Sequence, residues 1–584
     1  MEQEKKSEQL QYARHSLAHL LAAAIQEIYP DALPTLGPAI DTGFYYDFEF
    51  ESPISEKDFS KIEQKMRQIG KTWKGFEKKE VTYDEAKKNF AGNPYKLELI
   101  EEINTKGEPI TLYTSGMFTD LCRGGHVENF SDVDMNGFKL ERVAGAYWRG
   151  NEKNKMLTRV YGLAFENKEA LLAYETQQEE ARKRDHRKLA KELDLLVFSD
   201  LVGSGMPLYT PKGNIVRNAI INFSRELNEE LGYGEVHTPN FNKAELFKIS
   251  GHYDKYKEDM LTVRSQYSEE DFFMKPMNCP QHTQIYASQS RSYRDLPIRY
   301  SDFANLYRDE RPGELSGLTR LRCFCQDDGH SFCREDQIKD EFIGVLNVVK
   351  KALTTYKMNY IVRLSLWDES KPEKYLGDVS VWKKSQKILE EILIENKIEY
   401  VIGIGEAAIY GPKMDIITKD SLGRKWQIST IQLDFIMPER FKLTYTDSDG
   451  KEKTPVMIHR AIIGSPERFM GILIEHYAGN FPLWLAPVQV KVIPVRTQHT
   501  EYAKTVADEL KKAGLRVDFD DADENLGKKV RAAKTSRIPY WIVLGDKEIE
   551  LTAVTLESRD EGQLGQMTIT DLVQKLTDEI KNKK

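Results

Sequence analysis

The sequence lacks the marks of a membrane or secreted protein. No apolar run reaches the roughly eighteen residues of a membrane-spanning helix, and Met1 leads directly into polar residues rather than a secretory signal. Cysteine is scarce, because the five cysteines are odd in number and no two have the CxxC spacing. Reduced thiols are therefore expected, which favours the cytoplasm over an oxidising compartment.

Net positive charge is absent as well. The 584 residues include 84 Lys and Arg against 92 Asp and Glu, which gives a formal net charge of −8. The chain as a whole therefore has no attraction for nucleic acid, and such a partner must be held by local basic patches. With 40% hydrophobic and 30% charged residues, a chain of this length is predicted to form several globular domains.

Changes of pattern divide the chain into four predicted regions. Residues 1–160 mix helices and strands, and residues 161–190 carry a charge-rich run that predicts one long, solvated linker helix. Residues 191–485 form the largest mixed block. Residues 486–584 alternate short strands with helices, which predicts a separate domain with a mainly parallel sheet. The fold class is therefore α+β, in several domains.

The segment "TRLRCFCQDDGHSF" (319–332) is the most informative. If it is a strand to about 328, alternate side chains share one face. That face carries two guanidiniums, a ring, an amide, a carboxylate and an imidazole: Arg320, Arg322, Phe324, Gln326, Asp328 and His330. It suits a phosphate, a flat heterocycle and a polar substrate lying side by side, although a solvated strand face would show the same alternation.

The same alternation argues against a local metal site made from Cys323, Cys325, His330 and Cys333. A strand turns Cys323 and Cys325 away from His330, so these thiols are predicted to lie in the core.

Three other segments carry polar groups in unusual settings. Arg308 and Glu310 end an apolar strand before a Pro-Gly turn, and Cys279 stands in a rigid segment rich in proline. Arg468 lies in the first turn of a predicted helix, where the helix dipole favours anions.

Two pairs of metal-ligating residues stand four apart in the N-terminal region. They are His15 and His19 in "HSLAH", and Cys122 and His126 in "CRGGH". Residues at this spacing share one face of a helix, and three imidazoles with one thiol make a good zinc set. From spacing alone, a metal site and a metal-free site are both open.

Together these segments resemble the threonyl-tRNA synthetases of bacterial type, a family of class II aminoacyl-tRNA synthetases. The three class II motifs follow in order as "NAIINFSRELNEELGYGEVHTPNF", "YRDERPGELSGLTRLRCFCQDD" and "IGSPERFMGILIEHY". The segments "MNCPQH", "QDDGH", "YGPKMD", "IQLDF" and "MIHRAIIGS" point to threonine. The resemblance covers essentially the whole chain but begins at the first predicted helix, so the small ubiquitin-like domain of the family is expected to be absent.

The resemblance implies a domain order and an activity. It implies an N-terminal α+β editing domain, a catalytic core with an antiparallel sheet, a C-terminal α/β anticodon-binding domain and a homodimer. The implied reaction joins L-threonine to tRNA(Thr) through threonyl-adenylate, with ATP and Mg²⁺, followed by hydrolytic editing of seryl-tRNA(Thr).

The family's catalytic zinc falls on Cys279, His330 and His459. Three such ligands with an open fourth position are typical of a zinc site that binds substrate. The resemblance implies that threonine chelates through its amino group and hydroxyl. A metal that needs an oxygen ligand rejects valine. Pocket shape alone would not, because valine is nearly isosteric with threonine and shape separates such a pair by only about 10²-fold.

The remaining synthetic residues also follow from the resemblance. It implies that Arg308 holds the α-phosphate, Glu310 accepts from the adenine amino group, Phe324 stacks on the ring and Arg468 grips the γ-phosphate, with Arg320 nearby. Gln326 is expected to support the adenylate and the tRNA ribose. The pocket for amino acid and adenylate is expected to include Met277, Asp328, Tyr410, Lys413, Gln427, Gln432 and Ser465. Gln281 and Ser429 stand where the family usually has glycine, and either side chain is large enough to crowd the pocket wall, although no expected ligand is lost.

Editing is expected because serine also has an amino group and a hydroxyl, and one missing methyl group gives roughly 1–3 kcal/mol of discrimination. The family's editing residues fall on His15, His19, Lys96, Asp120, Cys122 and His126. Relatives of the alanyl type use zinc there, whereas threonyl editing sites are thought to work without it, and we favour the metal-free interpretation.

The C-terminal domain resembles the anticodon-binding module, in which Arg531 and Glu548 match expected contacts. Lys528, Arg531 and Lys534 form a basic stripe, as a solvated helix also would. A further arginine of the family is replaced by Glu557, with Arg559 two residues on.

Two other functions remain to be tested. A non-catalytic, synthetase-like RNA-binding protein would have no reason to keep Cys279, His330 and His459. A trans-editing hydrolase would need only the N-terminal region. Threonine-dependent pyrophosphate exchange separates the ligase from both.

Overall fold

A computed structural model describes residues 2–420 and 423–584, and the chain divides into two compact units, Met1–Glu179 and Glu180–Lys584. In those residues, no helix combines the length and the apolar character needed to cross a bilayer.

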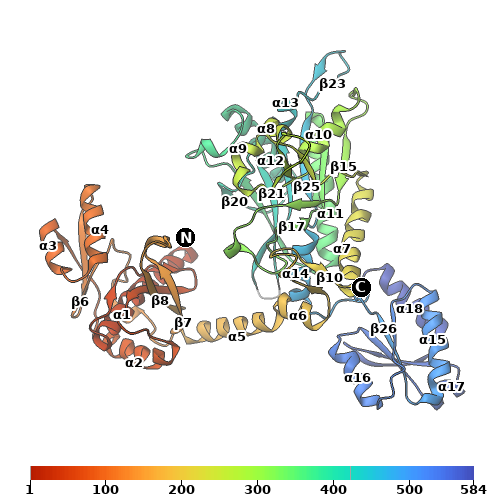
Figure 1. The fold of residues 1–584 in the computed structure, drawn as a ribbon, viewed down its shortest axis with the longest axis horizontal. Coiled ribbons are helices and arrows are strands. Elements are labelled where there is room, and N and C mark those ends of the chain that lie inside the picture. Colours follow the sequence, from red (N-terminus) through yellow and green to blue (C-terminus); the bar gives the residue numbers. More distant parts are fainter. Residues whose placement is uncertain (1, 421–422) are drawn as a thin grey trace. The chain divides into compact units, whose positions relative to one another are not determined.

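The first unit is built on helix α1 (Glu2–Ile28), which packs against an antiparallel sheet (Figure 1). Leu17, Leu20, Leu21 and Ala24 are buried, which is the i, i+3, i+4, i+7 spacing of a core-facing helix. The sheet consists of β1 (Leu33–Pro34), β2 (Ala39–Ile40), β3 (Gly43–Glu49), β8 (Met156–Ala164) and β7 (Phe138–Tyr147).

A second, three-stranded sheet completes this unit. It consists of β4 (Glu77–Val81), β5 (Ile110–Ser115) and β6 (Phe118–Leu121). The remaining α-helices before α5 are α2 (Phe59–Gly70), α3 (Tyr83–Asn89) and α4 (Pro94–Thr105). Asn93 caps α4, since its side chain accepts from the amides of Tyr95 and Lys96.

The predicted single linker helix is wrong, because the chain forms two helices there. Helix α5 (Lys168–Arg184) ends before Asp185, which has a non-helical conformation and caps α6 (His186–Glu192) by accepting from Arg187 N at 2.8 Å. Leu189 and Ala190 of α6 are buried, so this second helix belongs to the core of its unit instead of being solvated.

The second unit contains an eight-stranded sheet, which confirms the predicted antiparallel core (Figure 1). Its order is β11 (Gly234–Glu235), β15 (Ile298–Asp302), β18 (Asp328–Cys333), β25 (Val456–Ala461), β22 (Lys425–Asp434), β21 (Lys413–Lys419), β19 (Tyr360–Leu366) and β20 (Tyr400–Ile404). Only the outermost pairs, β11 with β15 and β19 with β20, are parallel among the described strands of this sheet.

One face of this sheet is covered by helices and the other forms a pocket. Val456 and Ile458 of β25 join the core beneath α7 (Pro211–Glu230), α11 (Ile338–Thr355) and α14 (Pro466–His476). His459, the next residue after Ile458, has the opposite orientation in the alternation and lines the pocket on the other face. Helices α10 (Cys279–Ala287) and α12 (Val379–Glu395) also belong to this unit.

The C-terminal residues form a five-stranded sheet that is mixed, not mainly parallel as predicted. Strand β26 (Val490–Pro494) lies parallel to β27 (Val517–Phe519) and β28 (Tyr540–Leu544), whereas the last two pairings are antiparallel. The remaining elements are β29 (Val554–Ser558), β30 (Gly562–Met567), α15 (Thr500–Lys512), α16 (Leu526–Thr535), α17 (Asp546–Glu550) and α18 (Ile569–Lys581).

Candidate active site

The segment 319–332 is not one continuous strand. It forms β17 (Cys323–Cys325), which pairs with β16 (Asn305–Tyr307), and then β18 in the large sheet. Asp327 stands at the break. Its carboxylate accepts from the amides of Ile462 and Ile463 and pairs with Arg460 at 2.7 Å, and this buried network draws the chain out of the strand.

Five of the six side chains predicted to share a face nevertheless lie along cavities. Two cavities that share wall residues are lined by Arg320, Phe324, Gln326, Asp328 and His330. Arg322 departs from the prediction, because its guanidinium donates to the Glu310 carbonyl oxygen at 2.8 Å. Of the two thiols predicted to lie in the core, Cys325 is buried, whereas Cys323 is only partly buried.

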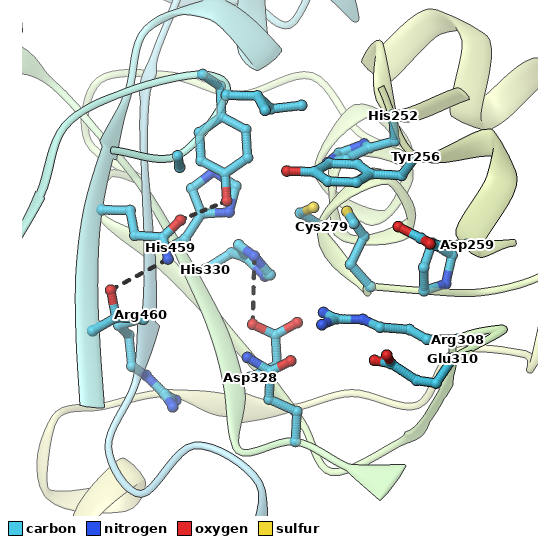
Figure 2. Close-up of a pocket in the computed structure, with 18 of the residues that line it drawn as sticks. His252, Tyr256, Asp259, Cys279, Arg308, Glu310, Asp328, His330, His459 and Arg460 are labelled. Carbon is cyan, nitrogen blue, oxygen red and sulfur yellow. Dashed lines mark hydrogen bonds and ion pairs between the residues drawn. The ribbon is translucent and has the colours of Figure 1, made fainter. Parts of the chain in front are cut away.

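Three metal-ligating side chains from distant segments meet in the first cavity, which has a volume of about 350 Å³ (Figure 2). Cys279 begins α10, while His330 and His459 lie directly opposite each other on β18 and β25. Their ligand atoms all lie within 4.8 Å of one another, and all three residues are buried. A soft thiolate and two imidazoles at this separation fit a zinc ion that keeps one position open to the cavity.

Neighbouring groups fix both imidazoles. His459 Nε2 lies 2.9 Å from Asp434 Oδ2, and His330 Nδ1 lies 2.7 Å from His282 Nδ1. Burial raises the pKa of the Cys279 thiol well above its ordinary value and lowers that of His330. The Cys279 thiol and the His330 imidazole are therefore neutral without a metal, and a bound cation would displace the thiol proton.

Predicted amino-acid residues surround these ligands. Met277, Asp328, Tyr410 and Gln432 line the same cavity. The Tyr410 hydroxyl donates to Gln432 Oε1 at 2.6 Å, and the Tyr410 ring stacks on His459 with centroids 4.4 Å apart. Burial raises the pKa of Asp328. These groups give the cavity a polar wall on either side of the metal-ligating set.

Lys413 is placed differently from the other predicted pocket residues. It is not among the residues that line these two cavities, and its ammonium pairs with Asp415 Oδ2 at 3.0 Å. Asp415 Oδ1 in turn accepts from Gln427 at 2.8 Å, so Lys413 contacts the pocket wall through a carboxylate.

The second cavity, of about 240 Å³, gathers positive charge. Arg308, Arg320 and Arg468 line it together with Glu310, Phe324, Gln326, Gln427 and Ser465. Burial lowers the pKa of Arg468, and the nearby charges of Arg308 and Arg320 lower it further. Burial likewise lowers the pKa of Arg308. Three cations that repel one another favour a polyanionic ligand such as a triphosphate.

The two departures from the family pattern differ in effect. Gln281 does not crowd the pocket wall, because its amide donates to Pro239 O at 2.8 Å and Asn242 Oδ1 at 3.0 Å, outside the lining of both cavities. Ser429 does line the second cavity, and its hydroxyl donates to Ala461 O at 2.6 Å.

A second candidate site lies in the first unit. The ligand atoms of His15, His19, Cys122 and His126 all lie within 4.8 Å of one another. His15 Nε2 is 3.2 Å from His19 Nε2, and Cys122 Sγ is 3.3 Å from His126 Nε2. Burial lowers the pKa of His126 to about 2 and raises that of Cys122 to about 11. This neutral set fits a tetrahedral ion in its chemistry, and equally a site that positions water.

A buried charge pair stands beside this second set. Lys96 and Asp120 lie 2.5 Å apart, both almost completely buried, and the Tyr46 hydroxyl donates to Asp120 Oδ2 at 2.5 Å. His15, His19, Lys96, Asp120 and Cys122 line one cavity of about 420 Å³. All six predicted editing residues are thus brought together, since His126 contacts Cys122.

Comparison with known proteins identifies the family. A threonine–tRNA ligase of Thermotoga neapolitana is 47% identical over 98% of this chain and 89% of its own length, and one of Thermosynechococcus vestitus is 45% identical over 98% and 95%. The chain belongs to the threonyl-tRNA synthetase family.

Three family models match separate segments of the chain. The class II tRNA synthetase core domain (G, H, P, S and T) matches residues 256–477, the anticodon binding domain matches 489–579, and the threonyl and alanyl tRNA synthetase second additional domain matches 110–161. A solved threonyl-tRNA synthetase structure from Cryptosporidium parvum Iowa II, described as an RNA binding domain, is 36% identical with a TM-score of 0.65, over 68% of this chain and 98% of that one. A putative threonyl-tRNA synthetase from Aeropyrum pernix is 28% identical with a TM-score of 0.60, over 69% and 96%.

In this threonyl-tRNA synthetase, Lys528, Arg531 and Lys534 are exposed on α16, as the predicted basic stripe requires. Glu548 is already engaged, because its carboxylate accepts from Gly545 N at 2.9 Å and from the Thr555 hydroxyl at 2.8 Å. Arg559 donates to the carbonyl oxygen of Arg537 at 2.9 Å, so its side chain is committed within the fold.

Sequence reasoning missed several residues that hold the side chains of the candidate sites in place. His282, Asp434, Tyr46 and Asp327 were not singled out, although each contacts or orders a candidate site residue. Their signal was weak: Asp434 and His282 lie within the segments "IQLDF" and "MNCPQH", whereas the pairing of Tyr46 with Asp120 is visible only in three dimensions.

Proposed function

We propose that the cavity around Cys279 is where this threonyl-tRNA synthetase selects L-threonine for ligation to tRNA(Thr). The single observation that carries the proposal is the meeting of Cys279, His330 and His459, buried and within 4.8 Å, in a cavity that shares its wall with the arginine cluster. A zinc ion held there by three protein ligands could expand its coordination and accept both an amino group and a hydroxyl oxygen. Valine lacks that oxygen and would be rejected.

The second cavity would hold ATP with Mg²⁺. Arg308 lines both cavities, so it stands where the amino-acid carboxylate and the α-phosphate would meet, and its charge would stabilise the negative charge that develops there. Phe324 offers an apolar ring 5.2 Å from the Arg308 guanidinium, Glu310 offers an acceptor for the adenine amino group, and Arg468 and Arg320 would hold the outer phosphates.

The candidate editing site of the first unit, around His15 and Cys122, would hydrolyse seryl-tRNA(Thr). His15, His126 and Cys122 would position the water and the terminal ribose, without a metal ion. The buried Lys96–Asp120 pair would keep His19 oriented, since His19 Nδ1 lies 3.5 Å from Asp120 Oδ2. We propose further that the protein acts in the cytoplasm as a homodimer, and that Arg531 contributes to the anticodon contact.

The deciding experiment measures threonine-dependent exchange of pyrophosphate into ATP together with zinc content, for the natural protein and for Cys279→Ser. The proposal expects one zinc per active site in the first protein, and loss of both zinc and exchange in the variant. A natural protein without stoichiometric zinc, or one that activates valine as readily as threonine, would refute the selection mechanism.

A further inference from the structure

A buried histidine at the start of α6 joins two segments of the candidate ATP site. His186 is 5% exposed. Its Nδ1 lies 2.7 Å from Oε1 of Glu475 in α14, and its Nε2 lies 3.0 Å from the backbone nitrogen of Leu318. Leu318 precedes Thr319 and Arg320 in the loop that follows the RDERPG segment.

These two contacts fix the tautomer of the ring. A backbone amide can only donate, so Nε2 must accept from Leu318 N and Nδ1 must carry the proton that it donates to Glu475. Ligand atoms of Asp185, His186 and Glu475 also lie within 4.8 Å of one another. Because the Nε2 lone pair of His186 is already used, this group is better explained as a structural link than as a metal site.

The Leu318 amide lies in a tight turn whose own backbone hydrogen bonds do not include it. Ser316 O accepts from Thr319 N at 2.8 Å and from Arg320 N at 3.2 Å, whereas Leu318 N bonds to His186. Leu318 is almost completely buried. Without the imidazole, its amide would be a buried donor with no acceptor, which a folded loop avoids by moving.

The position of this turn sets the position of two arginines. Thr319 O, one residue beyond the anchored amide, accepts from Arg468 Nε at 3.0 Å. Arg320 Nε donates to Glu310 Oε2 at 2.8 Å. The imidazole is therefore linked through the backbone of this turn to Arg320 and Arg468, which line the positively charged cavity, although it does not line that cavity itself.

Gly317 shows how closely the turn approaches the ring. Its φ of +47° lies in the left-handed region, and a Cβ atom there would stand 2.1 Å from His186 Nε2. A side chain at this position would have to displace either the turn or the imidazole.

We propose that His186 is a positioning residue for ATP: through Nε2 it holds the turn 316–320, so that Arg320 and Arg468 keep the spacing that the triphosphate requires. The inference rests on the proposed ATP site. It assigns the effect to the Leu318 bond and not to the Glu475 bond.

Two variants separate the two bonds. In His186→Asn the amide can still donate to Glu475 from the place of Nδ1, but no acceptor reaches Leu318 N. In His186→Gln the side-chain oxygen reaches the place of Nε2 and can accept from Leu318 N. We expect the Asn variant to raise the KM for ATP in pyrophosphate exchange about tenfold, with kcat and the KM for threonine changed less, and the Gln variant to stay near the natural enzyme.

Equal ATP effects in both variants, or none in either, would overturn the inference. Arg468→Ala serves as the reference for the ATP site itself: if it leaves the KM for ATP unchanged, the proposed site is wrong, whereas a large effect there with an unaffected Asn variant refutes only the role of His186.

A second pair keeps the test valid if the Asn variant does not fold. Gly317→Ala forces the turn away from the ring and should reproduce the ATP effect. Gly313→Ala, in the same loop, is the matched control, since an added Cβ meets nothing within 4 Å there. A normal KM for ATP in a folded Gly317→Ala protein would contradict the proposal.

Discussion

His459 and Asp434 form a buried pair in which Nε2 of the imidazole lies 2.9 Å from Oδ2 of the carboxylate. The carboxylate can only accept when ionised, so Nε2 carries the proton and Nδ1 keeps its lone pair. The other oxygen of Asp434 has a separate task, since Oδ1 accepts from the amides of Ile436 and Met437. One residue thus orients a candidate metal-ligating side chain and, as a side-chain cap, accepts from the first two amides of the short helix α13 (Ile436–Arg440).

Asp434→Asn should weaken zinc binding without disturbing the fold. An asparagine retains the Oδ1 acceptor for the cap but loses the acceptor for His459, so we expect zinc affinity to fall about 10- to 100-fold. Competition against a chelator of known affinity measures this, and thermal unfolding of both proteins provides the control. Unchanged affinity would show that Asp434 serves the cap alone.

Removing Arg308 should impair catalysis far more than binding. Its side chain is partly buried and lines both cavities, so Arg308→Ala should lower kcat for pyrophosphate exchange about 10²–10³-fold, as the loss of one charge-stabilising donor does elsewhere. Arg294→Ala, which removes an exposed arginine outside both cavities, is the matched control. A tenfold effect or less would place the charge stabilisation on another group.

His126→Ala should separate the two activities. Threonine activation and threonylation should remain normal, because His126 lies in the other compact unit, whereas seryl-tRNA(Thr) should accumulate when serine is supplied. The measurement is the time course of seryl-tRNA with purified tRNA(Thr). If the variant still clears seryl-tRNA, the editing assignment is wrong.

Counting zinc distinguishes the two interpretations of the editing site. A metal-free site predicts one zinc per chain, which Cys279→Ser reduces to none and Cys122→Ala leaves at one. Two per chain, with one lost in each variant, would show that the four converging ligands of the first unit hold an ion.

His186 should make the protein less stable in acid. Burial lowers its pKa to about 4, below the roughly 6.5 of an unfolded chain. Its contribution is therefore complete above about pH 6.5 and is lost as the pH falls towards 4, at about 1.4 kcal/mol per pH unit. His186→Gln should flatten this part of the curve of unfolding free energy against pH. The charged groups around the ring (Glu475, Asp185, Arg187 and Arg424) remain in both proteins, so their contribution cancels in the difference. Parallel curves would contradict the assignment.

Features that depend on residues close together in the chain could be predicted from the sequence. The alternation of residues 320–330 predicts a shared face, and five of its six polar or aromatic side chains line the two cavities; the spacing of residues 17–24 is likewise the one by which α1 buries its apolar side chains. Both patterns depend on neighbours a few residues apart, which the sequence displays directly.

Interactions between distant segments account for the errors. The predicted strand breaks at Asp327 because its carboxylate binds Arg460 of β25 and the amides of Ile462 and Ile463, which follow that strand. The predicted linker helix breaks at Asp185, and the helix after it is buried because His186 meets Glu475 and Leu318. Gln281 turns away from the pocket towards Pro239 and Asn242. None of these partners can be chosen from a single sequence without knowing the fold.

The direct pairing of His330 with His459 across β18 and β25 has one more consequence. The distance between the two imidazoles is inherited from the regular lattice of the backbone, which does not stretch as loops do. Hydrogen-bonded peptide groups thus set the spacing of the two imidazoles, so surface loops can change while the spacing on which the proposed metal site depends stays constant.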